Sequence, residues 1–382
     1  MSEDQFSLTG RQVEFRESCF EYARDVLLPI AEEGALGRVN RPLVAALGAK
    51  GLIGEMLHLE SAEDRRPISA LKLCLVREGL ARACPEAETA LALQGLGGYP
   101  LMRFGSTEVR ETWGRRLLSG DAVAAFALTE PDAGSDVGAL ALAAEPDGEG
   151  FRLSGTKVFI SNAPDADVYT LFARTSGARG GRGITAFALP GDSPGLSGQP
   201  LELISPHPIG RLDLAGVYLG PEHVLGEVDR GFSVAMETLG LFRPSVGAFA
   251  VGMAQCALDA AVEHVGKREV FGRPLAAMQA IAHRLADLAT QLEGARLLVY
   301  HAAARADSEG ANATIAAMAK LFATETAQWV VDQAVQLHGA RGLQQGHLLE
   351  RLYREVRAPR IYEGASEVQR TIIARGLIKG GE

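Results

Sequence analysis

The sequence is poor in cysteine and holds no arrangement typical of a metal site. Only four of the 382 residues are cysteine, and no two of them form a Cys-x-x-Cys pair. The histidines of the C-terminal half show no ligand spacing with carboxylates, so we expect no metal. Scattered thiols and a polar, acidic start, MSEDQFSLTG, without an apolar signal segment predict a reduced, cytoplasmic protein.

An excess of positive charge and long uninterrupted apolar runs are also lacking. The 38 basic residues are outnumbered by 47 acidic ones, which gives a formal net charge of −9. Because a nucleic-acid partner requires a basic surface, this balance argues against nucleic acid. Charged residues interrupt the apolar stretches, so we expect no membrane partner either.

The sequence does contain enough apolar residues, 47% of the chain, for two or three packed domains. Residues 1–120 show helical periodicity, and residues 121–228 contain short runs of β-formers separated by turn residues. Residues 229–382 are helical again, as is typical of a bundle. The longest apolar stretches of that last region lie at 245–267, 277–306 and 313–338. We therefore predict an α+β fold with a helical N-terminal domain, a small central β-barrel or sandwich, and a C-terminal helical bundle.

The stretch RIYEGASEVQR, residues 360–370, places a carboxylate just before a predicted helix. Ser366 and Gln369 have the spacing of an S-x-x-Q capping box, so we expect Glu363 on the loop that enters the helix. Burial in an apolar pocket would raise the pKa of Glu363, whereas the N-terminus of the helix would lower it. Taken alone, Glu363 would be interpreted as structural, because glutamates are common at helix starts.

A first candidate ligand-binding segment is AFALTEPDAGSD, residues 125–136, in which an apolar run leads into a turn. Main-chain N–H groups and hydroxyls at Thr129, Gly134 and Ser135 could hydrogen-bond a polar cofactor edge or a pyrophosphate. An ordinary Pro/Gly turn is the alternative interpretation.

A second candidate is KVFISNA, residues 157–163. Strict alternation predicts that Lys157, Phe159 and Ser161 share one face of a strand. The aromatic ring and the hydroxyl of that face could stack on and hydrogen-bond a flat ring. Alternatively, the segment is simply an exposed edge strand.

Two later motifs contain groups suited to a phosphate or to close approach of the backbone. In REVFGRPL, residues 268–275, Arg268 follows a helix and is available to a phosphate, although a solvated arginine is the commoner case. In AVQLHGARGL, residues 334–343, Gly339 either lets the backbone approach a ligand or ends a helix.

Taken together and in this order, five motifs make the chain resemble the acyl-CoA dehydrogenase family over nearly its whole length. They are T-E-P-x-A-G-S-D, the Ser-Asn strand, R-x-x-F-G-x-P-L, Q-x-x-G-x-x-G and Y-E-G-x-S-E-x-Q-R. The resemblance implies a helical N-terminal domain, a central β domain and a C-terminal four-helix bundle, with FAD between them. It also implies a homotetramer, a dimer of dimers, whose subunits share cofactor contacts.

By the same resemblance, Glu363 matches the base that removes the α-proton of an acyl thioester while the β-hydrogen leaves as hydride to flavin N5. Tyr362, Gly364, Arg243 and Ser135 match positions on the substrate side. The resemblance implies cofactor contacts at Phe126, Thr129, Gly134, Ser135, Phe159, Ser161, Arg268, Phe271, Gln336, Gly339, Ala365 and Glu367.

Those cofactor positions fall into two groups under the resemblance. Ser161 is expected to face flavin N5. Arg268 and Phe271 are expected to reach the FAD of a neighbouring subunit, with Gln336 and Gly339 on its adenosine side.

The chain departs from the family pattern at several positions. Phe242 stands where some branches carry their base, which leaves Glu363 as the candidate among the matched positions. Gly240 replaces an acidic residue that contacts the pantetheine arm, so the carrier could be CoA or an acyl carrier protein. The replacements on the cofactor side are Val270, Ala340, Leu343 and Ala365.

We therefore predict an FAD-dependent enzyme that dehydrogenates an acyl thioester between its α and β carbons, with an electron-transferring flavoprotein as the acceptor that the family implies. One alternative is a flavin oxidase or monooxygenase on the same fold, and Glu363 argues against the monooxygenase. The other is a non-catalytic scaffold, which would be expected to lose Glu363, Arg268 and Ser161. All three residues are present.

Overall fold

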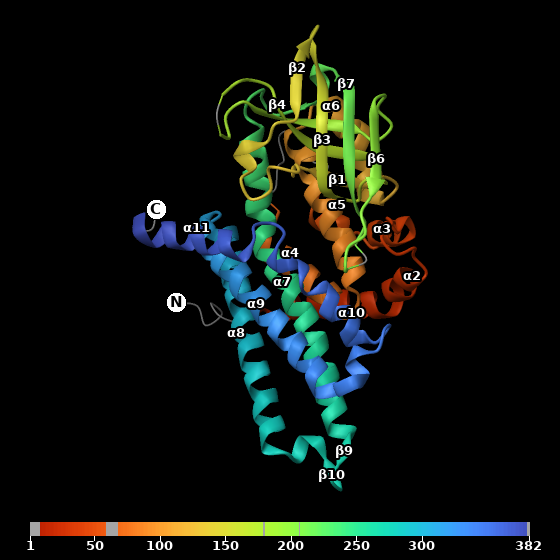
Figure 1. Cartoon of the computed structure of the whole chain (residues 1–382), viewed down its shortest axis with the longest axis vertical. Helices are drawn as coiled ribbons and strands as arrows, with labels where there is room; N and C mark the ends of the chain where they lie inside the picture. The colour runs from red at the N-terminus through yellow and green to blue at the C-terminus, as the bar shows by residue number, and fades with distance from the viewer. Residues whose placement is uncertain (1–7, 59–67, 179, 206, 380–382) are drawn as a thin grey trace. The chain divides into compact units, whose positions relative to one another are not determined.

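The computed structural model describes residues 8–58, 68–178, 180–205 and 207–379. The chain forms two compact units, and each is described here by itself. We call the first the bundle unit; it comprises Met1–Leu28, Ser69–Glu88 and Gly240–Glu382. We call the second the sheet unit; it comprises Pro29–Ile68 and Thr89–Leu239. Figure 1 labels the elements of both.

The bundle unit is built from long helices with small apolar residues at their contacts. Its helices are α1 (Gly10–Tyr22), α4 (Ala70–Ala83), most of α7 (Gly231–Lys267), α8 (Gln279–Glu309), α9 (Ala313–His338), α10 (Leu348–Glu355) and α11 (Ser366–Lys379). Buried alanines, leucines and valines of α4 and α7–α10 form one continuous core. Because alanine lets helices approach closely, this composition explains why the three apolar stretches predicted from the sequence pack as α7, α8 and α9.

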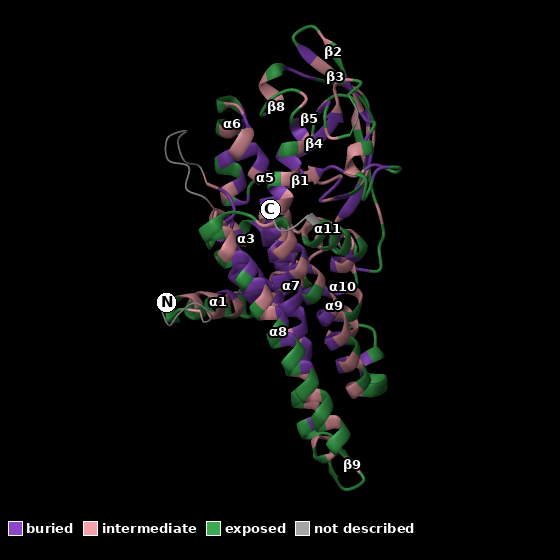
Figure 2. Ribbon diagram, turned by 90° about the vertical axis from the view of Figure 1, so that its left-hand side faces the viewer, coloured by how far each residue is buried: buried purple, intermediate pink, exposed green. Residues whose placement is uncertain are grey.

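Helix α7 is long and apolar enough to cross a membrane by length and composition alone. However, 72% of its most apolar window is buried inside the fold, as Figure 2 shows by its purple colour. The core helix of a soluble protein passes the same test. As expected from the sequence, charges interrupt this helix, because Arg243 and Asp259 bound the 15 uncharged residues between them.

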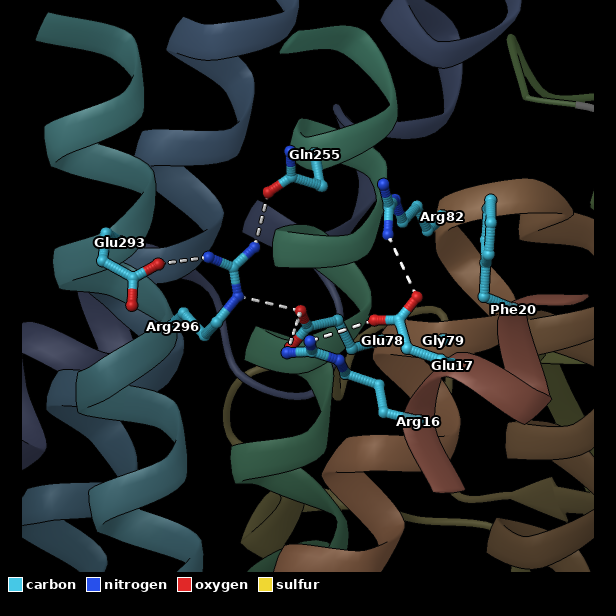
Figure 3. A pocket seen from close by; sticks show the side chains of 9 residues that line it. All are labelled: Arg16, Glu17, Phe20, Glu78, Gly79, Arg82, Gln255, Glu293 and Arg296. Carbon is cyan, nitrogen blue, oxygen red and sulfur yellow. Dashed lines mark hydrogen bonds and ion pairs between the residues drawn. The ribbon is translucent and has the colours of Figure 1, made fainter. Parts of the chain in front are cut away.

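A surface pocket of the bundle unit lies among α1, α4, α7 and α8, and Figure 3 shows its lining. Glu78, almost fully buried, accepts hydrogen bonds from the Tyr300 hydroxyl at 2.6 Å and from Arg296 Nε at 2.9 Å. Arg16 and Arg82 both form ion pairs with Glu17. Carboxylates thus already neutralise the guanidinium groups of this pocket. We interpret these ion pairs as contacts that hold the helices together.

The sheet unit contains a mixed sheet and the helices that accompany it. Its strands are β1 (Ala124–Ala127), β2 (Ala143–Asp147), β3 (Gly150–Ser161), β4 (Val168–Arg174), β5 (Ile184–Pro190), β6 (Leu196–Pro200), β7 (Ile209–Leu219) and β8 (Val224–Leu225). The strand order is β6-β7-β3-β2-β4-β5-β8, and β1 pairs in parallel with β4. The helices are α3 (Arg41–Ala49), α6 (Thr107–Ser119) and most of α5 (Pro85–Phe104). The predicted order of helical, β and helical regions is confirmed.

Strand β3 does not alternate as the sequence predicted. Its pairing with β7 shifts register between Lys157 and Ile160, and Phe159 has a left-handed φ of 55°. The bulge turns Phe159 outward to 56% exposure while Lys157 is fully buried. The predicted common face for Lys157 and Phe159 is therefore wrong, because one extra residue in a bulge reverses the direction of the side chains that follow.

Gly97 lets helix α5 lie directly on the polypeptide backbone of β1. A Cβ atom on Gly97 would come within 2.5 Å of the Ala125 main-chain nitrogen. The buried Gln94 joins the same two elements, because its side-chain oxygen accepts a hydrogen bond of 2.9 Å from the Ala124 N–H. Close backbone approach therefore accounts for Gly97 in α5.

We predict that Gly97→Ala lowers the midpoint of thermal unfolding by about 1–4 °C, because overpacking against backbone costs about 1–3 kcal/mol and cannot be relieved by a side-chain rotation. Gly294→Ala is the matched control, since Gly294 is also inside a helix and its Cβ would make only an ordinary 3.7 Å contact with Phe322. Differential scanning calorimetry of both variants checks this. Equal midpoints would contradict the packing argument.

Candidate active site

The loop that carries Glu363 has an unusual backbone conformation. It joins the short helix Ala358–Arg360 to α11, as the sequence predicted. Glu363 has a φ of 50° and Gly364 a φ of 95°, so two consecutive residues are left-handed. For a glutamate this conformation costs about 1–3 kcal/mol and persists only when the surroundings enforce it. Strain of this kind is frequent at functional sites.

Side chains from α9 and α11 hold this loop in place. The Gly364 carbonyl accepts hydrogen bonds from Lys320 Nζ at 2.7 Å and from Gln369 Nε2 at 2.8 Å. The Ser366 hydroxyl donates to Glu325 of α9 at 2.6 Å. The predicted capping box is therefore wrong, because the side chains of Ser366 and Gln369 bind α9 and the loop instead of each other's backbone.

Glu363 is partly exposed as a residue, but one oxygen atom of its carboxyl group is covered and unsatisfied. Its Oε2 atom is buried and has no hydrogen-bond partner among the residues that the structure describes. Burial raises the pKa of Glu363 above its ordinary value, and the charges of Arg77, Lys320 and Arg243 oppose that rise. Burial therefore outweighs the three opposing charges at this carboxyl group.

Two of the cations that face Glu363 differ in how they are neutralised. Arg77 of α4 is 2% exposed, forms an ion pair with the buried Glu88, and donates a 2.6 Å hydrogen bond to Ser245 Oγ. Arg243 of α7 lies on the predicted substrate side, and its Nε has no partner among the described residues. Burial lowers the pKa of Arg243, and Glu363 opposes that change. Glu363 Oε2 and Arg243 Nε thus remain available to a ligand.

Sequence reasoning missed Lys320 and Arg77. The signal was present for Lys320, which is the lone cation of the apolar stretch AAMAKLFA, but not for Arg77, which lies among other charged residues in LKLCLVREGLARA. A buried cation in such a stretch needs a compensating charge nearby. Tyr362, also predicted on the substrate side, packs against the bundle core, and burial raises the pKa of its hydroxyl. Ala365 and Glu367 flank the start of α11.

The remaining predicted residues of the bundle unit lie elsewhere. Arg268 and Phe271 belong to the hairpin β9–β10 (Glu269–Val270 and Arg273–Pro274), and Phe271 is 95% exposed. Gln336 is near the end of α9, which Gly339 terminates with a φ of 62°. Sixteen residues separate Lys320 from Gln336 on α9, which is about 24 Å along the axis. The structure therefore separates these groups from Glu363 of the same chain.

In the sheet unit, a buried ion pair fixes the turn that carries Thr129, Gly134 and Ser135. Glu130 pairs with Lys157 Nζ at 2.8 Å and also accepts hydrogen bonds from the main-chain N–H groups of Ala141 and Leu142. Burial lowers the pKa of Lys157 to about 8 despite its carboxylate partner. The rigid turn leaves Gly134 and Ser135 exposed, with open space beside Gly134.

The other predicted residues of the sheet unit have different surroundings. Ser161 Oγ forms a 2.7 Å hydrogen bond with His207 Nε2, a contact across 46 residues that the sequence did not signal. Burial lowers the pKa of His207 to about 4, so the ring is neutral at physiological pH. The Phe126 ring packs on Phe172 with a centroid distance of 4.9 Å, so core packing accounts for Phe126.

Family models match almost the full length of the chain. The matches are described as the N-terminal domain (residues 9–121), the middle domain (125–217) and the C-terminal domain (229–378) of acyl-CoA dehydrogenase. The chain belongs to the acyl-CoA dehydrogenase family.

Individual relatives agree with this assignment. The chain is 35% identical to cyclohexane-1-carbonyl-CoA dehydrogenase of Geobacter metallireducens, over 95% of this chain and 96% of that protein. It is 40% identical to subunit CarC of the caffeyl-CoA reductase–Etf complex of Acetobacterium woodii, over 74% of this chain and 76% of that protein. A glutaryl-CoA dehydrogenase from Mycobacterium smegmatis, solved in complex with FADH2, has a TM-score of 0.90 at 26% identity, with coverage of 100% and 97%.

This acyl-CoA dehydrogenase homologue is an oxidoreductase that acts on CH–CH groups, and its cofactor is FAD. The described residues fit that cofactor. The sheet unit offers an exposed aromatic ring at Phe159 and an open glycine at Gly134.

We predict that Glu130→Ala reduces FAD retention several-fold, because the turn with Gly134 and Ser135 loses both its ion pair and its anchor to two main-chain N–H groups. Asp132→Ala, an exposed position on the same turn, is the matched control and should retain FAD fully. The ratio of flavin to protein absorbance after gel filtration measures this. Equal flavin content in the two variants would show that the turn does not bind FAD.

Proposed function

We propose that this enzyme dehydrogenates an acyl thioester between its α and β carbons, with Glu363 as the base that removes the α-proton. The observation that carries the proposal is the buried, unpartnered Oε2 atom of Glu363, held on a strained loop and facing three cations. A carboxylate without hydrogen bonds or water is a stronger proton acceptor than a solvated one.

The chemistry requires a base of this kind. The α-hydrogen of a thioester is weakly acidic, so its removal needs a carboxylate positioned beside it. FAD, when bound, supplies the acceptor for the β-hydrogen, which leaves as hydride. Glu363 takes the α-proton and becomes neutral, which also relieves the cost of holding its charge in a dry site.

The carrier and the electron acceptor follow from the relatives. Those relatives are named for CoA thioesters, which supports a CoA substrate and leaves an acyl carrier protein as the alternative to test. One of them belongs to a complex with Etf, which supports an electron-transferring flavoprotein as the acceptor.

We also propose a cytoplasmic homotetramer. In support, Phe271 is almost fully exposed at the hairpin, and Gln336 lies about 24 Å along α9 from the Glu363 loop. Phe271 and Gln336 are therefore placed to contact the cofactor of a neighbouring subunit and not the site of Glu363 in their own chain.

Glu363→Gln should retain FAD and lose turnover by at least about 100-fold, because a general base contributes 10²–10⁴-fold and the amide cannot accept the proton. Folding raises the pKa of this carboxyl, so its charged form opposes folding above its ordinary pKa. The amide should therefore not lower the unfolding midpoint at pH 7. Glu263→Gln, an exposed residue paired with Lys267, is the control. Full turnover in Glu363→Gln would contradict the assignment of Glu363 as the base.

The acid side of the pH profile should reflect the same carboxyl group. Glu363 must be ionised to act, so kcat/KM of the free enzyme should fall as the pH drops through a pKa above the ordinary glutamate value. Initial rates from pH 5 to 9 test this. An acid limb at or below the ordinary value would contradict a buried base.

The acyl group and its carrier can be identified by anaerobic bleaching of the flavin absorbance. A panel of short, branched and cyclic acyl thioesters, each on CoA and on acyl carrier protein, should contain one member that bleaches the flavin rapidly. We expect the CoA form to react faster. Bleaching by none of them, with turnover that consumes oxygen, would instead favour a flavin oxidase.

A further inference from the structure

Lys320 is a buried cation without an obvious structural reason. It is 0% exposed within α9 and forms no ion pair among the residues that the structure describes. Its hydrogen-bond acceptor is the main-chain carbonyl of Gly364 at 2.7 Å. An ammonium group loses its hydration when buried, and a single neutral acceptor does not replace it. An apolar side chain would suit the core of α9 better.

The position of Lys320 relative to the loop is specific. The carbonyl that it binds belongs to the residue immediately after Glu363, and both residues are left-handed. The loop is also anchored at its two ends, because Arg360 and Ser366 both bind Glu325 of α9. Together with Gln369 of α11, Lys320 therefore holds the middle of a loop whose ends are already fixed, and it is the charged member of that pair of donors.

Lys320 lies in a cluster of charged groups that includes Glu363, the proposed base. Lys320 faces Glu363 on the loop, Arg243 on α7, Glu325 on its own helix and Glu367 on α11. Glu363 in turn faces Arg77 on α4 in addition to Lys320 and Arg243. Arg77 is shared with Glu88, whereas Lys320 is the cation bonded to the Glu363 loop itself.

We infer that Lys320 is a positioning residue for the dehydrogenation: its ammonium group holds the Gly364 carbonyl, which keeps Glu363 in its left-handed conformation, and its charge keeps the Glu363 carboxyl in the ionised form that accepts the proton. This inference rests on the proposed function, because Lys320 acts only through Glu363.

The energetics agree with a functional role. Burial lowers the pKa of Lys320 to about 8, and burial raises that of Glu363. Folding therefore disfavours the charged form of both groups at neutral pH, yet each charge partly offsets the cost of the other. Removing the Lys320 charge should move the Glu363 pKa further upward.

The test compares Lys320→Met with Lys320→Arg, which keeps the charge, and with Lys267→Met, an exposed control. In Lys320→Met we expect the acid limb of kcat/KM to move up by about one pH unit or more, and kcat to fall at least about tenfold. Lys320→Arg should restore the acid limb. The unfolding midpoint at pH 7 should stay the same or rise in Lys320→Met, a result that a purely structural lysine would not give.

A second measurement does not depend on turnover. Infrared titration of the protonated carboxyl band, taken as the difference between a protein and its Glu363→Gln counterpart, reports the pKa of Glu363 directly. The pKa of Glu363 should rise in Lys320→Met and not in Lys320→Arg. If Glu363→Gln keeps full activity, the proposed function fails, but this titration still decides whether Lys320 controls Glu363.

An unchanged titration and an unchanged acid limb in Lys320→Met would overturn the inference. If Lys320→Met does not fold, Lys320→Gln serves in its place, because a neutral amide can still donate to the Gly364 carbonyl. It should shift the titration upward in the same way. Failure of both neutral variants to fold would show that Lys320 is structural, and would equally overturn the inference.

Discussion

The candidate site depends on one buried carboxylate that the protein itself does not fully satisfy. Glu363 lies on a loop whose backbone is strained, and three cations face it without a hydrogen bond to its Oε2 atom among the described residues. The surrounding packing covers this oxygen atom, so its charge is not stabilised by water there. The anchors from α9 and α11 keep the strained loop from relaxing.

The sheet unit solves a related problem with a different arrangement. There the buried lysine, Lys157, has a carboxylate partner in Glu130, and the pair fixes a turn and leaves the glycine and serine of that turn exposed. In the bundle unit the buried lysine has only a carbonyl. The charge of Lys157 is neutralised by its partner, so the pair only fixes the turn. The charge of Lys320 is not neutralised by an ion pair among the described residues and acts on Glu363.

Much of this organisation could be predicted from the sequence. The long apolar stretches became α7, α8 and α9, and the Y-E-G motif lies on the predicted loop before α11. Periodicity could not reveal the bulge at Phe159, because a bulge depends on pairing with β7. Nor could it reveal the contact between Ser161 and His207, which are 46 residues apart. The capping box failed for a similar reason, since Ser366 found a better partner on α9.

The lysine in the middle of α9 and the glutamate on its neighbouring loop both resist folding in their charged forms. They are therefore positions at which heat resistance and turnover are opposed. A population of variants selected only for survival at high temperature would be expected to replace them early, whereas selection for turnover would keep both residues in the roles proposed above. Stabilised forms of this protein are best sought by leaving these two residues untouched and changing the packing of the helices far from the loop.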